Sequence, residues 1–166
     1  MDPSITIRLA TIKDIPDLIH LRHLMFEWMG HTEKLNLDTN DIENEKYFQR
    51  AIPDSSFIGW LAFTKNNKAI ASGGLVIDQH PPGPSNPSGK IGYIMDISVE
   101  PDFRKQGIAK EILKRILMYL KDKNITLVSL HASEMGKSLY EKSGFRPTNE
   151  MRLKMGELNK SYLNIE

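Results

Sequence analysis

A short basic loop with one glycine, Arg104-Lys-Gln-Gly107-Ile-Ala109, has the residue types that most directly indicate a binding chemistry. It lies between a predicted strand and a predicted helix, so the unpaired N–H groups and positive dipole end of that helix would face it. Gly107 has no Cβ and lets another group approach the backbone closely, while Arg104 and Lys105 add positive charge. The loop therefore predicts a site for a phosphate or pyrophosphate group.

Two regular elements would hold this loop in place. Tyr93–Val99 is rich in β-branched and aromatic residues and is followed by Pro101, which predicts a strand. Apolar residues then recur at helical spacing as far as Leu120, which predicts a helix over 106–121. Alternation along the strand predicts one face of Tyr93, Met95, Ile97 and Val99 and an opposite face of Ile94, Asp96 and Ser98.

The loop and a second segment resemble the GNAT acetyltransferase superfamily. Arg104-x-x-Gly107-x-Ala109 matches the acetyl-CoA signature [Q/R]-x-x-G-x-[G/A] of that family. The segment Ser138-Leu-Tyr-Glu-Lys-Ser-Gly-Phe145 resembles the LYEKxGF stretch near the C-terminus of many members, and the distance between the two is typical. The loop pattern supports the resemblance because a predicted strand precedes it, a predicted helix follows it and the second segment also matches.

The resemblance implies that acetyl-CoA is the co-substrate and that no metal is needed. Loop amides would face the pyrophosphate, and backbone groups at the end of the strand would pair with the pantetheine arm. The implied cofactor-binding residues are Ile97, Ser98, Val99, Arg104, Lys105, Gln106, Gly107, Ile108, Ala109, Lys110, Ser133 and Tyr140. Ser133 and Gly136 stand where the family often has Asn and Ala, so Ser133 is expected to keep a hydrogen bond.

Three side chains are candidates for moving protons. Tyr140 occupies the place of the family's general acid, and a phenol with a pKa of about 10 is protonated at neutral pH. The alternative is a tyrosine that packs its helix. Asp96 matches the second acid of a Glu-Asp pair found in some members, with Met95 in place of the first, so it contacts either the amine or a structural partner. His131 is either a base or a hydrogen-bonded strand end, and ordered water is a further alternative.

The acceptor side is expected near the end of the first helix. The resemblance places the first two helices beside the acceptor, where Glu27 and Trp28 would suit a cationic amine, and Tyr93 is a third candidate. The ordinary alternative is that Trp28 belongs to the core and Glu27 to the solvated surface. The proline-rich loop 80–89 is interpreted as a stiff surface connection.

Composition restricts the class of protein. The 166 residues suit one domain over 1–166, and 40% hydrophobic and 26% charged residues are typical of a globular chain. A net charge of +1 gives no indication of a nucleic-acid partner. The absence of cysteine excludes disulfides and a cysteine nucleophile. No apolar run approaches the ~20 residues of a membrane span, and there is no signal peptide, so we expect a cytoplasmic protein with no membrane partner.

The order of predicted elements indicates a mixed α/β (α+β) fold. Directly connected strands favour antiparallel pairing, and the strand–helix–strand unit over 91–131 favours a parallel crossover. With the GNAT resemblance this predicts a mixed, mostly antiparallel sheet of six to seven strands with a splayed pair, 91–99 and 126–131, and about four helices. The predicted strands are 5–9, 57–63, 69–77, 91–99, 126–131 and 151–155, of which 57–63 and 69–77 form a hairpin. The first predicted helix follows a capping pattern of Thr11 and Asp14 and ends at Gly30, and the others span 41–51, 106–121 and 133–142.

We therefore expect an N-acetyltransferase that moves acetyl from acetyl-CoA to the amine of a small molecule or peptide by direct attack. The first alternative is a non-catalytic acyl-CoA-binding regulatory module, which Met95 favours and Tyr140 opposes. A nucleotide-binding protein is the second, but the chain has neither a G-x-x-x-x-G-K-[S/T] nor a G-x-G-x-x-G motif. A homodimer is compatible with the resemblance, and the sequence does not decide it.

Overall fold

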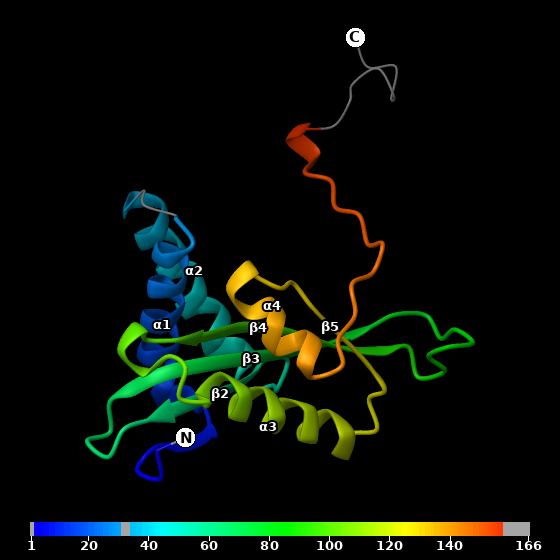
Figure 1. Cartoon of the computed structure of the whole chain (residues 1–166). Helices are drawn as coiled ribbons and strands as arrows, with labels where there is room; N and C mark the ends of the chain where they lie inside the picture. The colour runs from blue at the N-terminus through cyan, green and yellow to red at the C-terminus, as the bar shows by residue number, and fades with distance from the viewer. Residues whose placement is uncertain (1, 31–33, 158–166) are drawn as a thin grey trace. The chain divides into compact units, whose positions relative to one another are not determined.

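The structure is a computed structural model that describes residues 2–30 and 34–157. Its internal contacts divide the chain into two units, Met1–His131 and Ala132–Glu166. The first unit contains a five-stranded sheet, two helices that precede the second strand and one that follows the fourth (Figure 1). The second unit contains one helix and the segment after it.

The sheet follows chain order. Its strands are β1 (Thr6–Leu9), β2 (Ile58–Phe63), β3 (Ala69–Gln79), β4 (Lys90–Val99) and β5 (Leu127–Leu130). The first four pair antiparallel, and β5 pairs parallel to β4 after the crossover through a helix. The β4–β5 pairing runs from Ile91↔Leu127 to Ile94↔Leu130. The sheet is therefore mixed and mostly antiparallel, as predicted.

Helices cover both faces of the sheet. α1 (Ile15–Trp28) and α2 (Lys34–Ala51) lie on one face, and α3 (Ile108–Asp122) lies on the other (Figure 1). The first helix begins after a short 3₁₀ turn closed by the predicted capping box, in which Asp14 Oδ2 accepts a hydrogen bond from the Thr11 N–H at 2.7 Å. The predicted apolar stripe of α3 is buried at Ile108, Ile112, Leu113, Ile116 and Leu120.

α2 is longer than the predicted helix over 41–51. It begins at Lys34, and Leu37 is buried together with Phe48 and Ala51. Between them, the same face carries the half-buried polar residues Asp41 and Asn44. Of residues 36–40 only Leu37 is buried, so the helical period ahead of residue 41 is weak in the sequence. Residues 31–33 of the predicted polar stretch lie outside the described residues.

The predicted sixth strand is wrong. Met151–Lys154 has no regular structure, and a 3₁₀ turn, Met155–Glu157, follows it. Met151 is 94% exposed, so this segment lacks the buried face that would stabilise a strand. Among residues 2–30 and 34–157, the sheet has five strands instead of six to seven.

The second unit contains α4 (Glu134–Lys142), close to the predicted 133–142. Ser133 is its N-cap, and the Ser133 Oγ accepts a hydrogen bond from the Gly136 N–H at 3.2 Å. Gly144, with φ 95°, follows the C-terminus of the helix.

None of the helices in the described part of the chain combines the length and the apolar character that a membrane crossing requires.

Candidate active site

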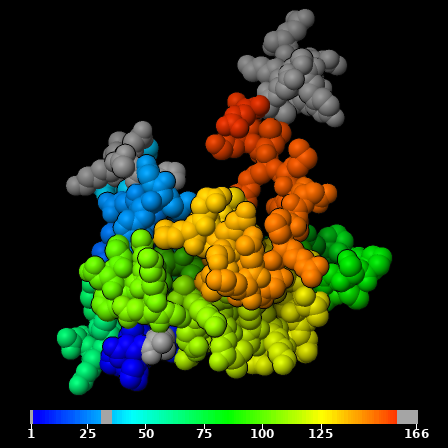
Figure 2. All heavy atoms as spheres, viewed as in Figure 1, coloured from blue at the N-terminus to red at the C-terminus, as the bar shows by residue number. Residues whose placement is uncertain are grey.

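The loop between β4 and α3 has a backbone suited to binding an anion. Lys105 (φ 61°) and Gly107 (φ 83°) both have left-handed conformations within three residues, and Gly107 is the N-cap of α3. Alternating backbone conformations of this kind turn successive N–H groups toward one point, and the first N–H groups of the helix have no intrahelical acceptor. Figure 2 shows the yellow-green atoms of this loop at the molecular surface, and Lys105, Gln106 and Gly107 are exposed. These features fit the predicted phosphate site.

Arg104 is engaged by the protein itself. Its Nε donates a hydrogen bond to the carbonyl oxygen of Val99 at 3.0 Å, and its guanidinium lies 4.5 Å from the centroid of the Trp28 ring. The residue therefore joins the loop to the end of β4 and to the last residue of α1. Trp28, which the sequence placed beside the acceptor, contacts the loop side of the site.

The other predicted loop residues differ in which groups they can present to a ligand. The Ile108 side chain is 1% exposed and belongs to the core, so only its backbone can meet a ligand. Lys110 is exposed, and the Gln106 Nε2 donates to the carbonyl oxygen of Asp102 at 3.2 Å. The site therefore presents mostly backbone groups, with Lys105 and Lys110 as exposed charges.

A β-bulge interrupts β4 next to the loop. Ser72 pairs with Ser98 and Gly74 with Met95, so Gly73 alone lies opposite Asp96 and Ile97. Asp96 has φ 58°, a conformation that Asp tolerates better than most residues. The predicted simple alternation is wrong here, because the extra residue shifts the phase of the strand.

The bulge brings Met95 and Asp96 to the same face as α1. Met95 packs against the core cluster that includes residues of α1, and Asp96 forms an ion pair with Arg22 of α1. The Ser98 Oγ, also on this face, lies 3.2 Å from the Ser72 Oγ and 3.5 Å from the Leu21 carbonyl oxygen. Ile97 lies on the other face, near Ile112 and Ile116. Ser98 can therefore contribute its backbone, but not a free hydroxyl, to a ligand.

Asp96 is a buried carboxylate with one strong partner. Its side chain is 12% exposed and that of Arg22 is 22% exposed, and the guanidinium also lies 4.8 Å from the Phe26 ring centroid. Burial raises the pKa of Asp96, and the charge and hydrogen bond of Arg22 offset part of that rise. A signal for this pair was present in the sequence, because Arg22 stands in the apolar stripe of α1, where an arginine needs a buried partner.

Tyr140 lies on α4 in the second unit. Its ring makes an edge contact with Phe145 at 5.9 Å, and a Cβ at Gly136 would approach its Cε2 to 2.9 Å. The glycine that replaces the family's Ala thus gives the phenol ring room against the helix. Burial raises the pKa of Tyr140 above its ordinary value of 10.0, which keeps the phenol protonated.

The remaining predicted residues are spread over the first unit. His131 is exposed and follows β5 directly, and Tyr93 is half-buried on β4, opposite Val76 and Ser129 of its neighbouring strands. Glu27 Oε1 lies 3.6 Å from the Nε2 of His23, its neighbour on α1. The structure thus joins Asp96 to Arg22 and Trp28 to Arg104, and Glu27 faces a histidine.

A mixed sheet with helices on both faces, and a glycine-containing loop at the start of α3, agree with the fold expected of an acyl-CoA-dependent transferase. Residues 15–145 match the Acetyltransferase (GNAT) family. The chain belongs to the GNAT family, and it is an acetyl-CoA-dependent N-acetyltransferase.

Solved structures agree with this assignment. The predicted acetyltransferase of Clostridium acetobutylicum, determined with acetyl-CoA, is 31% identical with a TM-score of 0.82, over 95% of this chain and 97% of that one. A GCN5-related N-acetyltransferase from Ralstonia eutropha is 29% identical with a TM-score of 0.83, over 92% and 99% of the two chains. The glucosamine-6-phosphate N-acetyltransferase of Arabidopsis thaliana, at 21% identity and a TM-score of 0.70 over 90% and 97%, shares the fold. Comparison with curated proteins found no significant match.

Proposed function

We propose that the protein transfers the acetyl group of acetyl-CoA to the amine of a small molecule or peptide by direct attack in a ternary complex. The observation that carries this proposal is the loop before α3, where two left-handed residues and a helix N-terminus gather free amides at an exposed surface. The pyrophosphate binds to the amides of Gln106 to Ala109, and Lys105 and Lys110 add charge. The Clostridium relative, determined with acetyl-CoA, supports the choice of ligand.

The pantetheine arm lies along the part of β4 that β5 does not cover. The β4–β5 pairing ends at Ile94, and β4 continues to Val99. The backbone of Ile97 to Val99 therefore has an edge available to an extended ligand, which would pair with it as an added strand does. The bulge at Asp96 lies at the start of this free edge.

Tyr140 is the proposed general acid, which protonates the coenzyme A thiolate as it leaves. The raised pKa of its phenol supports this role, because the phenol keeps its proton at neutral pH and can donate it. For the general base, Asp96 and His131 are the proposed candidates. Burial raises the pKa of Asp96, and Arg22 offsets part of that rise. His131 is exposed and lies just after the end of β5. Ordered water is the alternative base.

The acceptor amine binds on the α1 side of β4. Met95 and Asp96 face this side, Tyr93 is half-buried on the same strand, and Glu27 and Trp28 end α1. The aromatic rings and carboxylates of this set fit a cationic acceptor.

An amine panel tests the proposal. Wild type, Tyr140→Phe and Tyr119→Phe are assayed for release of coenzyme A and for acetylated product with small amines, amino acids, polyamines and peptide N-termini. We expect kcat of Tyr140→Phe to fall by about 10²-fold with little change in the KM for acetyl-CoA, because only proton donation is lost. Tyr119 of α3 contacts the ring of Trp60 on β2, away from Tyr140 in sequence and in a different unit, and its phenylalanine variant serves as the matched control with unchanged kcat.

The non-catalytic acyl-CoA-binding module, which Met95 favoured in the sequence, does not stand, because the chain is an acetyl-CoA-dependent N-acetyltransferase of the GNAT family. The panel therefore asks which amine is the acceptor and whether turnover depends on Tyr140.

A further inference from the structure

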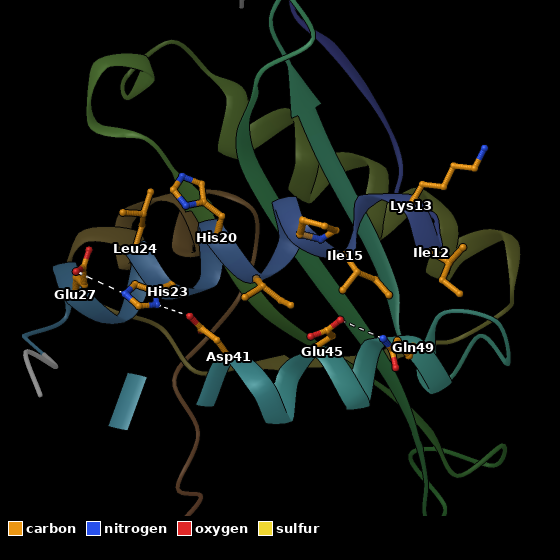
Figure 3. Close-up of a pocket in the computed structure, with 12 residues that line it drawn as sticks. Ile12, Lys13, Ile15, His20, His23, Leu24, Glu27, Asp41, Glu45 and Gln49 are labelled. Carbon is orange, nitrogen blue, oxygen red and sulfur yellow. Dashed lines mark hydrogen bonds and ion pairs between the residues drawn. The ribbon is translucent and has the colours of Figure 1, made fainter. Parts of the chain in front are cut away.

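A groove between α1 and α2 contains a histidine surrounded by carboxylates. The groove has a volume of about 1040 Å³, and Figure 3 shows His23 of α1 and Asp41 of α2 pointing toward one another across it. Asp38 and Asp41 are three residues apart on α2 and share a face of that helix. One ligand atom from each of His23, Asp38 and Asp41 lies within 4.8 Å of the others.

The two nitrogens of His23 have different surroundings. Nδ1 lies 2.5 Å from the Asp41 Oδ2, and Nε2 lies 3.6 Å from the Glu27 Oε1. A histidine that binds a metal usually donates its second ring N–H to a carboxylate, which fixes the tautomer and the ring orientation. In this structure the Nδ1 shares a hydrogen bond with the Asp41 Oδ2, and a cation that binds both atoms displaces the proton between them. The Glu27 carboxylate lies within ion-pair distance of Nε2 and would hold the ring in this orientation.

One carboxylate oxygen of Asp41 has no hydrogen-bond donor among the described residues. Its Oδ1 is buried and has no hydrogen-bond partner. A buried acceptor without a partner destabilises the folded chain, and more so when it is charged. A cation between the helices would use this oxygen together with Oδ2.

The charge of the groove favours a cation as well. Its described lining includes the carboxylates of Glu27, Asp41 and Glu45, and Lys13 is the single lysine or arginine in that lining. Figure 3 shows Lys13 at the opposite end of the groove from His23. The carboxylates near His23 therefore lack a lysine or arginine from the groove wall to balance them.

We propose that His23 Nδ1 and the carboxylates of Asp38 and Asp41 bind one divalent first-row transition-metal cation, Zn²⁺ or Mn²⁺, between α1 and α2. One imidazole and two carboxylates suit these ions, and water fills the remaining positions. Glu27 is a positioning residue that holds the imidazole. The bound ion stabilises the contact between two helices and takes no part in acetyl transfer, for which no metal is expected.

Calorimetric titration of the untagged full chain with ZnCl₂ and MnCl₂ tests the proposal. We expect one ion per chain in wild type and loss of that binding in His23→Gln and Asp41→Asn. Glu27→Gln should bind about tenfold more weakly, because a partner of the metal-binding histidine typically changes affinity by ~10–100-fold. His20→Gln is the matched control, since His20 lines the same groove outside the cluster and its loss should leave binding unchanged.

The proposal fails if wild type shows no saturable binding, or if His23→Gln binds as tightly as His20→Gln. If a variant does not fold, Mn²⁺ is instead titrated into the wild-type protein and the titration is monitored by nuclear magnetic resonance. Paramagnetic broadening must then begin at the signals of residues 23, 38 and 41. Broadening that begins elsewhere identifies a different or adventitious site and overturns the assignment.

Discussion

The ion pair of Asp96 and Arg22 shows how one residue is set by the others around it. At the bulge, Asp96 has a left-handed backbone conformation, which turns its carboxylate toward α1. There it forms an ion pair with Arg22, which lies in an otherwise apolar stripe of the helix. Removing one partner leaves the other buried and uncompensated, whereas removing both leaves no charge. The pair therefore has a large energetic coupling whatever its role in catalysis.

A double-mutant cycle measures this coupling. Asp96→Asn is chosen because Asn also tolerates a positive φ, and Arg22→Met keeps most of the side-chain volume. We expect each single variant to lose about 3 kcal/mol of unfolding free energy. The double variant should lose less than the sum by at least about 1 kcal/mol. Urea unfolding at pH 7 gives the four values, and additivity within about 0.5 kcal/mol would show that the two side chains do not interact.

Asp14 links stability to acid pH. Its carboxylate accepts hydrogen bonds from two Arg8 nitrogens at 2.8 and 2.7 Å and from the Thr11 N–H, and these hold its pKa well below the ordinary value of 3.8. Because the folded pKa is lowered, the stabilisation is complete above the unfolded pKa of about 4 and is lost as pH falls below it.

We therefore expect Asp14→Asn to lose about 2 kcal/mol at pH 7, with the difference from wild type shrinking as pH falls from about 4. Asp17→Asn is the control, because burial raises the pKa of Asp17 and its contribution has the opposite sign. Urea midpoints of the three proteins across pH 2.5–7 check this. A constant difference between wild type and Asp14→Asn over that range would contradict it.

At the residue scale, motifs with a local physical cause were predictable. The capping box follows from the side chains of Thr11 and Asp14, which bond to nearby backbone groups, and Gly107 can adopt its left-handed conformation because it has no Cβ. The partner of Asp96 was not predicted, because it is 74 residues away in sequence. The pairing of His23 with Asp41 is non-local in the same way and joins two different helices.

At the level of elements, strands were predictable in their bounds but not in their irregularities. β4 was placed within one residue, yet its bulge depends on how it meets β3 and leaves no mark in an alternating pattern. α2 was predicted too short because, of residues 36–40, only Leu37 is buried. These features depend on how elements pair and pack against each other, so they cannot be predicted from the periodicity of one segment.

Gly73 shows how closely β3 and α3 pack. A Cβ built at Gly73 would lie 2.4 Å from the Ile112 Cγ2, with Ile97 and Ile116 side-chain atoms at 3.4 Å. The missing side chain lets α3 lie directly on the strand that faces the bulge, so the glycine helps to position the loop that precedes the helix.

Gly73→Ala should lose about 2 kcal/mol of unfolding free energy, since the core must shift to accept one methyl group. Gly83→Ala is the matched control, because nothing lies within 4 Å of its Cβ. That variant should be neutral or slightly stabilised. Urea unfolding compares the two, and equal stability of both variants would show that α3 moves away from the sheet without cost.

For the whole molecule, the fold class was predictable from element order together with two motifs. The strand–helix–strand unit gave the parallel pair, and the hairpin gave the antiparallel part. The prediction of a sixth strand over 151–155 was wrong, because the short apolar pattern there has no buried face in the described chain. The GNAT assignment follows from the combination, since neither the loop pattern nor the fold alone specifies acetyl transfer.

We propose that the loop before α3 binds the pyrophosphate of acetyl-CoA. Calorimetric titration with acetyl-CoA tests it in wild type, Gly107→Glu and Asn124→Glu. Asn124 follows α3 at its other end with φ 56°, so its glutamate variant adds the same charge and similar backbone strain outside the loop. We predict binding by wild type and Asn124→Glu and at least about a hundredfold loss in Gly107→Glu, because a carboxylate would occupy the anion site. Equal binding by Gly107→Glu and wild type would place the cofactor elsewhere and contradict the account.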